Sequence, residues 1–166
     1  MAIPRFRPSL SLNEALGFLR SRLPLIGPRP GEFERRFGQR LLDGQQVILA
    51  PSGRVALYWL LRALELRRGD EVITQAFNFP AVPAAIQAAG AVPRFVDLAP
   101  DTFEPDPAHL EEVIGPRTRA VIITHLYGNP ADLDTLRQVC DRHQVPIIED
   151  CAQAIGATYK GRPVGT

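Results

Sequence analysis

The sequence predicts an α/β fold, in which a mostly parallel sheet carries helices on both faces. From residue 47 onward, short apolar runs alternate with helical patterns, and this order is typical of parallel strands joined by crossover helices. Two of these runs, residues 119–124 and 145–148, are apolar at successive positions, as expected for strands covered on both faces. The 166 residues are 45% hydrophobic and 22% charged, which suits one globular domain with a sizeable core.

The N-terminal residues precede this alternation and are expected to form a separate unit over residues 1–44. Residues 1–11 contain two prolines and no periodicity, which predicts an extended arm. Leucines at helical spacing predict an amphipathic helix over residues 12–23. A second amphipathic helix is expected over residues 32–42, with Phe33, Phe37 and Leu41 on one face and Asp43-Gly44 at its end.

Residues 45–166 contain the predicted sheet. Strands or extended segments are expected at residues 47–50, 71–74, 92–97, 119–124 and 145–148, and helices at residues 55–64, 81–89 and 108–114. A fourth helix is expected to begin with Asn129 as N-cap, Pro130 at the first helical position and Asp132 two positions later. The helix over residues 55–64 is apolar nearly all round, which predicts that it is buried.

Charge and cysteine content exclude several classes of function. The formal net charge of +1 indicates no strong attraction to nucleic acid or to a membrane surface. No apolar run reaches 18 residues, so no membrane span is expected, and the N-terminus lacks the apolar region of a signal peptide. Cys140 and Cys151 lie within predicted regular elements, which favours neither a zinc site nor a disulfide framework. A reduced, cytoplasmic setting is therefore expected.

The last predicted strand ends in two carboxylates, Glu149 and Asp150. Open α/β folds bind ligands at the carboxyl edge of the sheet, so we expect Asp150 to face a cationic or protonated group. Gln153 follows three residues later and offers both a donor and an acceptor to the same ligand. The alternative interpretation is that Asp150 caps the turn or helix that follows.

A second candidate site is the Ser52-Gly53-Arg54 turn before an apolar helix. The free amides and positive dipole end of a helix N-terminus attract phosphate, Gly53 allows close approach, and Arg54 adds a cation. The alternative is simple N-capping by Ser52, with Arg54 in solvent.

Three loops at strand ends thus supply an anion site, an aromatic plate at Phe77-Asn78-Phe79, and an acid at Asp150. Together they describe a pocket for a flat, phosphorylated ring that can be protonated, and pyridoxal phosphate is such a ring. A loop phenylalanine can equally belong to the core. Nucleotide binding is disfavoured, because no Gly-x-Gly-x-x-Gly or Walker sequence follows a predicted strand.

The chain also resembles the sugar aminotransferases of the DegT/DnrJ/EryC1/StrS family, which have the aspartate-aminotransferase fold. Residues 12–166 share its pattern almost throughout, and the matching segments are residues 31–34, 52–57, 69–73, 90–97, 116–122, 125–132, 149–157 and 159–165. The resemblance implies that residues 45–166 form the N-terminal part of the large domain, which binds pyridoxal phosphate. It also implies transfer of an amino group from an amino acid to a nucleotide-linked keto-sugar.

Specific roles follow from the resemblance at matching positions. Asp150 would hold the pyridinium nitrogen, Gln153 would bond the ring oxygen, and Phe79 would stack on the ring. Gly53 and Arg54 would hold the phosphate. Most members have Thr where this chain has Arg54, so that position departs from the family pattern.

The resemblance places the family's Schiff-base lysine some twenty residues beyond Gly165, outside this sequence. The only lysine, Lys160, matches a turn that many members also keep, so no catalytic residue is assigned and the chain alone is expected to be inactive. Family members generally form dimers, so a homodimer is expected. The alternative is a split-gene or degenerate half that acts as a binding or assembly module with a companion chain, and the DNA downstream of Thr166 would separate the two.

Overall fold

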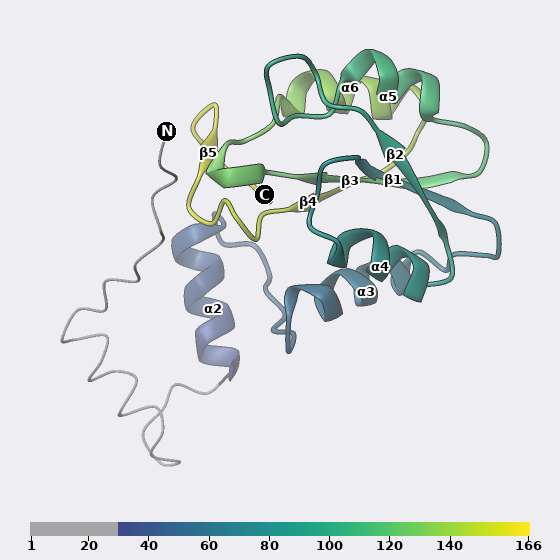
Figure 1. Cartoon of the computed structure of the whole chain (residues 1–166). Coiled ribbons are helices and arrows are strands. Elements are labelled where there is room, and N and C mark those ends of the chain that lie inside the picture. The colour runs from purple at the N-terminus through teal and green to yellow at the C-terminus, as the bar shows by residue number, and fades with distance from the viewer. Residues whose placement is uncertain (1–29) are drawn as a thin grey trace.

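The computed structural model describes residues 30–166, which form a sheet between two layers of helices (Figure 1). The expected N-terminal arm and the expected helix over residues 12–23 lie outside the described residues. The second expected helix is present as α2, Pro30–Leu41, with Gly38 packed against the backbone oxygen of Gln45. The α2 helix stands beside the carboxyl ends of the strands (Figure 1).

The sheet has four parallel strands in the order β2-β1-β3-β4, which confirms the predicted fold class. The strands are β1 Glu71–Gln75, β2 Val92–Val96, β3 Thr118–Thr124 and β4 Ile147–Asp150. In the pairing of β3 with β4, Thr124 is opposite Asp150, so both residues lie at the carboxyl edge.

Helices cover both faces of this sheet. On one face lie α3 Gly53–Ala63 and α4 Ala81–Ala88, and on the other lie α5 Pro107–Val113 and α6 Leu133–Arg142 (Figure 1). Strand side chains alternate between the two cores: Val72 and Ile122 pack with α3 and α4, whereas Ile73 and Val121 pack with α5 and α6. This alternation explains why the strand sequences are continuously apolar.

Two apolar segments are less buried than expected. Residues 47–50, expected to be a short buried strand or an extended segment, form no strand, and Ile48 is 84% exposed. The α3 helix is buried on one side only. Its Leu57 and Leu61 side chains belong to the core, whereas Leu60, on another side, is 53% exposed. The apolar composition of these two segments predicts that they are shielded from water. It does not show which residues shield them, and residues 30–166 leave them partly exposed.

The start of α6 also differs from the prediction. The helix begins at Leu133 with Asp132 as its N-cap, and the Asp132 carboxylate accepts hydrogen bonds from the Thr135 amide (3.4 Å) and hydroxyl (2.6 Å). Asn129 instead follows the short 3-10 helix η1, Leu126–Gly128. The Ala131 amide donates to His125 Nδ1 (3.1 Å), which holds the intervening chain in a loop.

The last strand is shifted and less buried than expected. It spans Ile147–Asp150 rather than residues 145–148, and all four residues are half-buried. Among residues 30–166, the strand lies at one edge of the sheet and pairs with β3 alone, so one side lacks the cover that a central strand has. Beyond it, β5 Thr158–Tyr159 and β6 Arg162–Pro163 form a small antiparallel hairpin.

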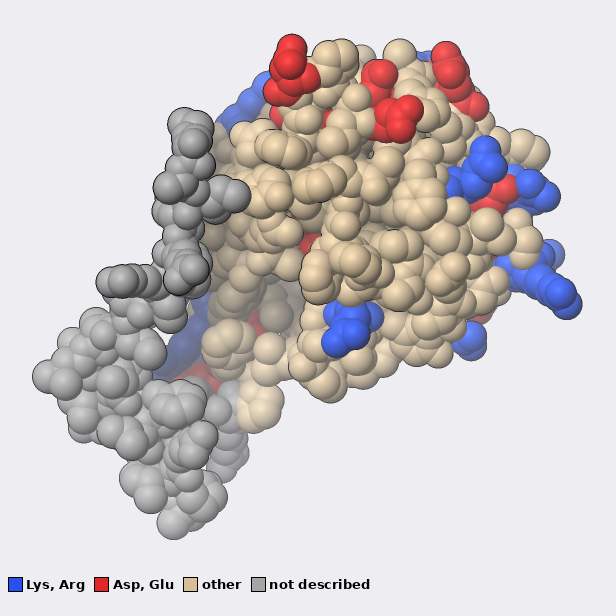
Figure 2. Space-filling model, in the orientation of Figure 1, with Lys and Arg blue, Asp and Glu red and all other residues tan. Residues whose placement is uncertain are grey.

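The amino edge of the sheet carries a cluster of ion pairs that is remote from the carboxyl edge. Glu71 accepts from Arg117 (2.7 Å), and Asp70 pairs with Arg119 (3.1 Å). Figure 2 shows basic side chains gathered on one side of the molecule and acidic side chains over the α5 and α6 layer.

Within residues 30–166, no helix has the length and apolarity needed to cross a membrane.

Candidate functional site

A cavity of about 570 Å³ lies at the carboxyl edge of the sheet and brings together four of the five predicted site residues. Gly53 and Arg54 come from the start of α3, Phe79 from the loop after β1, and Asp150 from the end of β4. Residues of α2, of the start of α4 and of the segment after β4 also line it. The cavity therefore forms where three loops, far apart in the sequence, meet.

Asp150 both faces this cavity and bonds the turn that follows it. Its Oδ1 accepts a hydrogen bond from the Ala152 amide (3.1 Å), and its Oδ2 receives only a long contact from the Thr124 hydroxyl (3.5 Å). A carboxylate has about four acceptor positions, so these contacts leave lone pairs for a ligand. The two interpretations of Asp150 in the sequence are thus compatible.

The Phe79 loop is fixed by Asn78, for which sequence reasoning assigned no role. The Asn78 amide group donates to the hydroxyls of Thr74 (3.0 Å) and Thr124 (2.9 Å), while its oxygen accepts from the Phe79 amide (2.7 Å). Phe79 itself is 64% exposed and lines the cavity. The sequence did offer one signal for this role: a polar residue stands between two aromatic residues in the loop, and two of the predicted strands end in threonine.

Gln75 is a second missed residue, and it joins the carboxyl ends of β1 and β3. Its side chain is fully buried, accepts from the Thr124 amide (2.7 Å) and donates to the Thr124 oxygen (3.1 Å). This pair of bonds fixes the backbone of Thr124, whose hydroxyl contacts Asp150. Gln75 thereby supports the site from behind.

The start of α3 has free donors that face the cavity. Ser52 caps the helix through a hydrogen bond from the Val55 amide to Ser52 Oγ (3.3 Å), as the alternative interpretation expected. Within residues 30–166, the amides of Gly53 and Arg54 have no acceptor, and Arg54 has no ion-pair partner. A Cβ atom at Gly53 would meet nothing within 4 Å, so the backbone is open on that side. This arrangement can bind an anion.

Gln153 lies outside the set of residues that line the cavity. Its Oε1 accepts a hydrogen bond from the Tyr127 amide (2.9 Å), which connects the segment after β4 to η1. Tyr127 has a positive φ of 57°, a backbone conformation that a side chain-bearing residue rarely adopts. Gln153 therefore has a structural partner that the sequence did not indicate.

Neither Cys151 nor Lys160 offers a nucleophile to the cavity at neutral pH. Burial, with the nearby charges of Glu149 and Asp150, raises the pKa of the Cys151 thiol to about 12. Lys160 lies in the turn between β5 and β6, pairs with Asp134 and does not line the cavity. The hydrogen bond to Asp134 raises the pKa of Lys160, so its amine stays protonated.

Among residues 30–166, one group of possible metal ligands adjoins the cavity, where His125, Glu149 and Cys151 place ligand atoms within 4.8 Å of one another, and Glu149 and Cys151 also line the cavity. The Ala131 amide donates to His125 Nδ1 (3.1 Å), so this nitrogen carries the lone pair. In a neutral ring the proton is then on Nε2, 3.1 Å from Glu149 Oε2, and that nitrogen has no lone pair for a metal. His125 and Glu149 therefore form a hydrogen-bonded pair beside the Cys151 thiol, rather than a set of free metal ligands.

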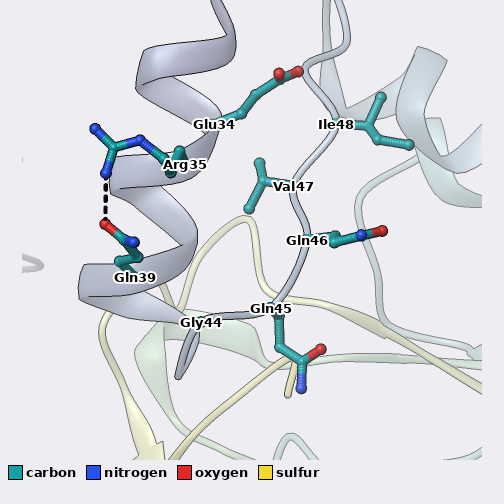
Figure 3. A pocket seen from close by; sticks show the side chains of 8 residues that line it. All are labelled: Glu34, Arg35, Gln39, Gly44, Gln45, Gln46, Val47 and Ile48. Atoms are coloured by element: carbon teal, nitrogen blue, oxygen red, sulfur yellow. Dashed lines mark hydrogen bonds between the residues drawn. The ribbon is translucent and has the colours of Figure 1, made fainter.

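A second hollow of about 330 Å³ lies between α2 and the irregular segment that follows it (Figure 3). Three of its polar side chains already have partners: Arg35 donates to Gln39 (3.0 Å), and Glu34 accepts from the Leu49 amide (2.8 Å). No acid, base and nucleophile converge there among the eight lining residues, so the carboxyl-edge cavity is the stronger candidate site.

Comparison with known proteins gives consistent matches along the chain. Residues 10–166 match the DegT/DnrJ/EryC1/StrS aminotransferase family. An L-glutamine:2-deoxy-scyllo-inosose aminotransferase of Micromonospora echinospora is 40% identical over 161 residues, with 94% of this chain covered. A dTDP-3-amino-3,4,6-trideoxy-alpha-D-glucose transaminase of Streptomyces venezuelae is 43% identical over 141 residues, with 85% of this chain covered.

A solved structure also matches the fold. The crystal structure of NtdA from Bacillus subtilis with bound cofactor PMP superposes with a TM-score of 0.83 at 36% identity, over 92% of this chain. In each case the chain spans less than half of the matched protein: 38% and 37% of the two relatives, and 36% of the NtdA chain.

Proposed function

The chain belongs to the DegT/DnrJ/EryC1/StrS aminotransferase family, and we propose that it is the N-terminal part of a pyridoxal-phosphate-dependent sugar aminotransferase. The enzyme would transfer an amino group from an amino acid to a keto group of a nucleotide-linked sugar. The name of one relative specifies L-glutamine and an inosose, which supports an amino-acid donor and a cyclic keto acceptor, and the name of the other specifies a dTDP-linked amino sugar, which supports the nucleotide link. NtdA, which binds PMP, supports the cofactor, since PMP is the amino form of pyridoxal phosphate.

The residues of the cavity fit this cofactor. The open backbone at Gly53 and the unused amides at the start of α3 fit a phosphate. The exposed ring of Phe79 offers a flat apolar face, and Asp150 offers an acceptor with free lone pairs. A phosphorylated aromatic ring with a basic nitrogen needs these three features together.

Asp150 has the central role in the proposed mechanism. When bound, pyridoxal phosphate supplies a protonated ring that takes up the electron pair released as a C–H bond breaks. The Asp150 carboxylate accepts a hydrogen bond from the ring nitrogen and keeps the proton on it, because a nearby negative charge stabilises the protonated form. The half-buried position of Asp150 reduces competition from water for this contact.

The other proposed residues bind and orient the cofactor. Arg54 and the Gly53 amide hold the phosphate, and the guanidinium can form two parallel hydrogen bonds to it. Phe79 packs on the ring and fixes its plane. Gln153 is proposed to donate through its amide nitrogen to the ring oxygen, because its Oε1 is already bonded to Tyr127.

The amine that carries the substrate chemistry is proposed to come from a lysine other than Lys160. Lys160 is the only lysine among the 166 residues, and its amine is protonated and paired with Asp134 outside the cavity. The chain would therefore bind the cofactor without a covalent bond, and alone it would not transfer amino groups.

The observation that carries this proposal is that Asp150 and the free amides of α3 open onto the same cavity. The test is a titration of the purified chain with pyridoxal phosphate, followed by its visible absorption. Asp150→Asn removes the negative charge at almost constant shape and should raise Kd roughly ten- to hundred-fold, the value of one charge-assisted hydrogen bond.

Asp141→Asn is the matched control, because Asp141 is an exposed aspartate on α6 outside the cavity. It should leave Kd unchanged. Treatment with borohydride and mass spectrometry should find no cofactor attached to Lys160. Equal affinity of the wild-type chain and Asp150→Asn would refute the proposed role of Asp150.

A further inference from the structure

We propose that His125 and Glu149 are positioning residues, which hold the end of β4 so that the Asp150 carboxylate faces the cavity. The proposal rests on the proposed function, because it concerns how Asp150 is held for the ring nitrogen of a cofactor. His125 does not line the cavity, and Glu149, which does, is assigned no contact with the cofactor because its Oε2 is already bonded to His125 and Gly165. The two side chains, with the backbone amides that they bind, are called the β4 brace below.

The β4 brace is a continuous chain of hydrogen bonds through a fully buried histidine. The Ala131 amide donates to His125 Nδ1 (3.1 Å), which places the ring proton on Nε2. Nε2 then donates to Glu149 Oε2 (3.1 Å), and the same oxygen accepts from the Gly165 amide (2.8 Å). Each polar atom of the His125 ring has one partner, so the ring orientation and tautomer are fixed.

The Glu149 end of the brace is held in one charge state. Burial of Glu149 would raise its pKa, but hydrogen bonds from His125 and the Gly165 amide, with the charge of Arg137, hold the pKa below its usual value. Glu149 therefore stays ionised and accepts strongly at neutral pH. Gly165 has a φ of +83°, and a Cβ atom there would lie 3.1 Å from Cys151 Sγ, so this close approach requires glycine.

The brace acts on Asp150 because the two carboxylates are adjacent in one strand. Successive side chains of a strand point to opposite faces, so holding Glu149 on the α5 and α6 side directs Asp150 to the α3 side. The His125 amide also donates to the Asp150 backbone oxygen (3.1 Å). One residue thus binds both the side chain of Glu149 and the backbone of Asp150.

Asp150 needs such support because its own contacts are few. Its side chain has one hydrogen bond of 3.1 Å, from Ala152, and one long contact of 3.5 Å, from Thr124. In the part of the chain that the structure describes, its strand is at the sheet edge and pairs on one side. Without the brace, we expect the end of β4 to fray and the carboxylate to sample several orientations.

The first test uses the chain without cofactor and follows hydrogen exchange of the Ala152 amide by NMR, since this amide is the donor to Asp150 Oδ1. Glu149→Ala should raise the exchange rate of the Ala152 amide about tenfold or more, because Asp150 no longer keeps one orientation. Glu149→Gln retains one carbonyl oxygen that can accept from both His125 and Gly165, so it should restore most of the protection.

The matched control is Glu111→Ala. Glu111 also pairs with a histidine, His143, but this pair is exposed and lies on α5 and at the end of α6. The control should leave Ala152 exchange unchanged. An unchanged rate in Glu149→Ala would overturn the proposal, and so would a wild-type ¹⁵N spectrum with the His125 proton on Nδ1, a result that needs no variant to fold.

The second test separates positioning from general stability through the affinity for pyridoxal phosphate. In the wild-type background, Glu149→Ala should raise Kd about tenfold, whereas in the Asp150→Asn background it should have no further effect, because the brace acts through Asp150. If Glu149→Ala lowered the affinity for pyridoxal phosphate equally in both backgrounds, Glu149 would have a merely structural role and the proposal would be overturned. If the wild-type chain binds no pyridoxal phosphate, the proposed function fails, and Ala152 exchange still decides the role of the brace.

Discussion

Asp150 lies at the end of β4, where its carboxylate accepts a hydrogen bond from the Ala152 amide and a long contact from the Thr124 hydroxyl. An acid directly after an apolar run predicted a carboxylate at the ligand-binding edge, and the structure places Asp150 in the wall of a cavity with Gly53 and Phe79. The sequence could not predict the contact from Thr124, because that hydroxyl comes from another strand. The sequence therefore predicted which side chain offers a carboxylate to a ligand, but not which residues hold that carboxylate in place.

The hydrogen-bond partners of Asn78 and Gln153 could not be predicted from the sequence. Gln153 is predicted to bond a ligand, and the structure adds that its oxygen accepts from the Tyr127 amide, which leaves its amide nitrogen for the predicted contact. Asn78 was placed in the aromatic loop without a role, yet it holds three groups of the site. Amide side chains have four hydrogen-bonding positions, and their partners depend on tertiary structure rather than on local sequence.

Asn78→Ala should therefore destabilise the chain by about 1–3 kcal/mol, because it leaves the hydroxyls of Thr74 and Thr124 without a donor in a buried setting. Urea denaturation followed by circular dichroism measures this loss.

Asn129→Ala is the comparison, since Asn129 is exposed and makes one hydrogen bond of 3.4 Å, to Glu104. It should change the free energy of unfolding by less than about 0.5 kcal/mol. Equal losses in the two variants would show that Asn78 does not organise the loop.

At the scale of elements, the start of α6 was the least accurate boundary. Asn129-Pro130 has the composition of a helix start, but the helix begins after Asp132. The structure favours the later start because His125 Nδ1 accepts from the Ala131 amide and the Tyr159 hydroxyl donates to Asp132 (2.6 Å). Both contacts bridge segments that are separate in the sequence, so a local pattern could not reveal them.

Asp132→Ala should destabilise the chain by about 1–2 kcal/mol, the usual cost of removing an N-cap. Asn129→Ala should show little change, because Asn129 caps only the short η1 helix, through its backbone amide, and alanine keeps that amide. Thermal or urea unfolding of the two variants tests the boundary directly. The reverse order of effects would support the helix start that the sequence suggested.

The contribution of this cap should also depend on pH. Hydrogen bonds from Thr135 and Tyr159 lower the pKa of Asp132 from its ordinary value of 3.8. A group whose pKa is lower in the folded state adds stability above its unfolded pKa and loses it as the pH falls through the folded value. The stability difference between wild type and Asp132→Ala should therefore shrink below about pH 4, and a constant difference down to pH 2 would contradict this origin.

At the scale of the whole molecule, the fold class was predictable because alternating strand and helix patterns allow few arrangements. The parallel order β2-β1-β3-β4, with helices on both faces, agrees with that expectation. The α3 helix and β4 are less buried than predicted, and residues 47–50 do not form the strand that was one of the two expectations for them. Apolar composition does not reveal which side of a segment is covered, and this chain spans only 38% of a relative that it matches.

The ring nitrogen of pyridoxal phosphate gives the most direct test of the central claim that Asp150 keeps this nitrogen protonated. The measurement is the ¹⁵N chemical shift of ring-labelled pyridoxal phosphate bound to the chain, recorded as a function of pH. A facing carboxylate should raise the pKa of the ring nitrogen by about one unit or more above that of the free cofactor, and Asp150→Asn should abolish the increase. A bound cofactor that titrates at the pKa of the free cofactor in the wild-type chain would contradict the account.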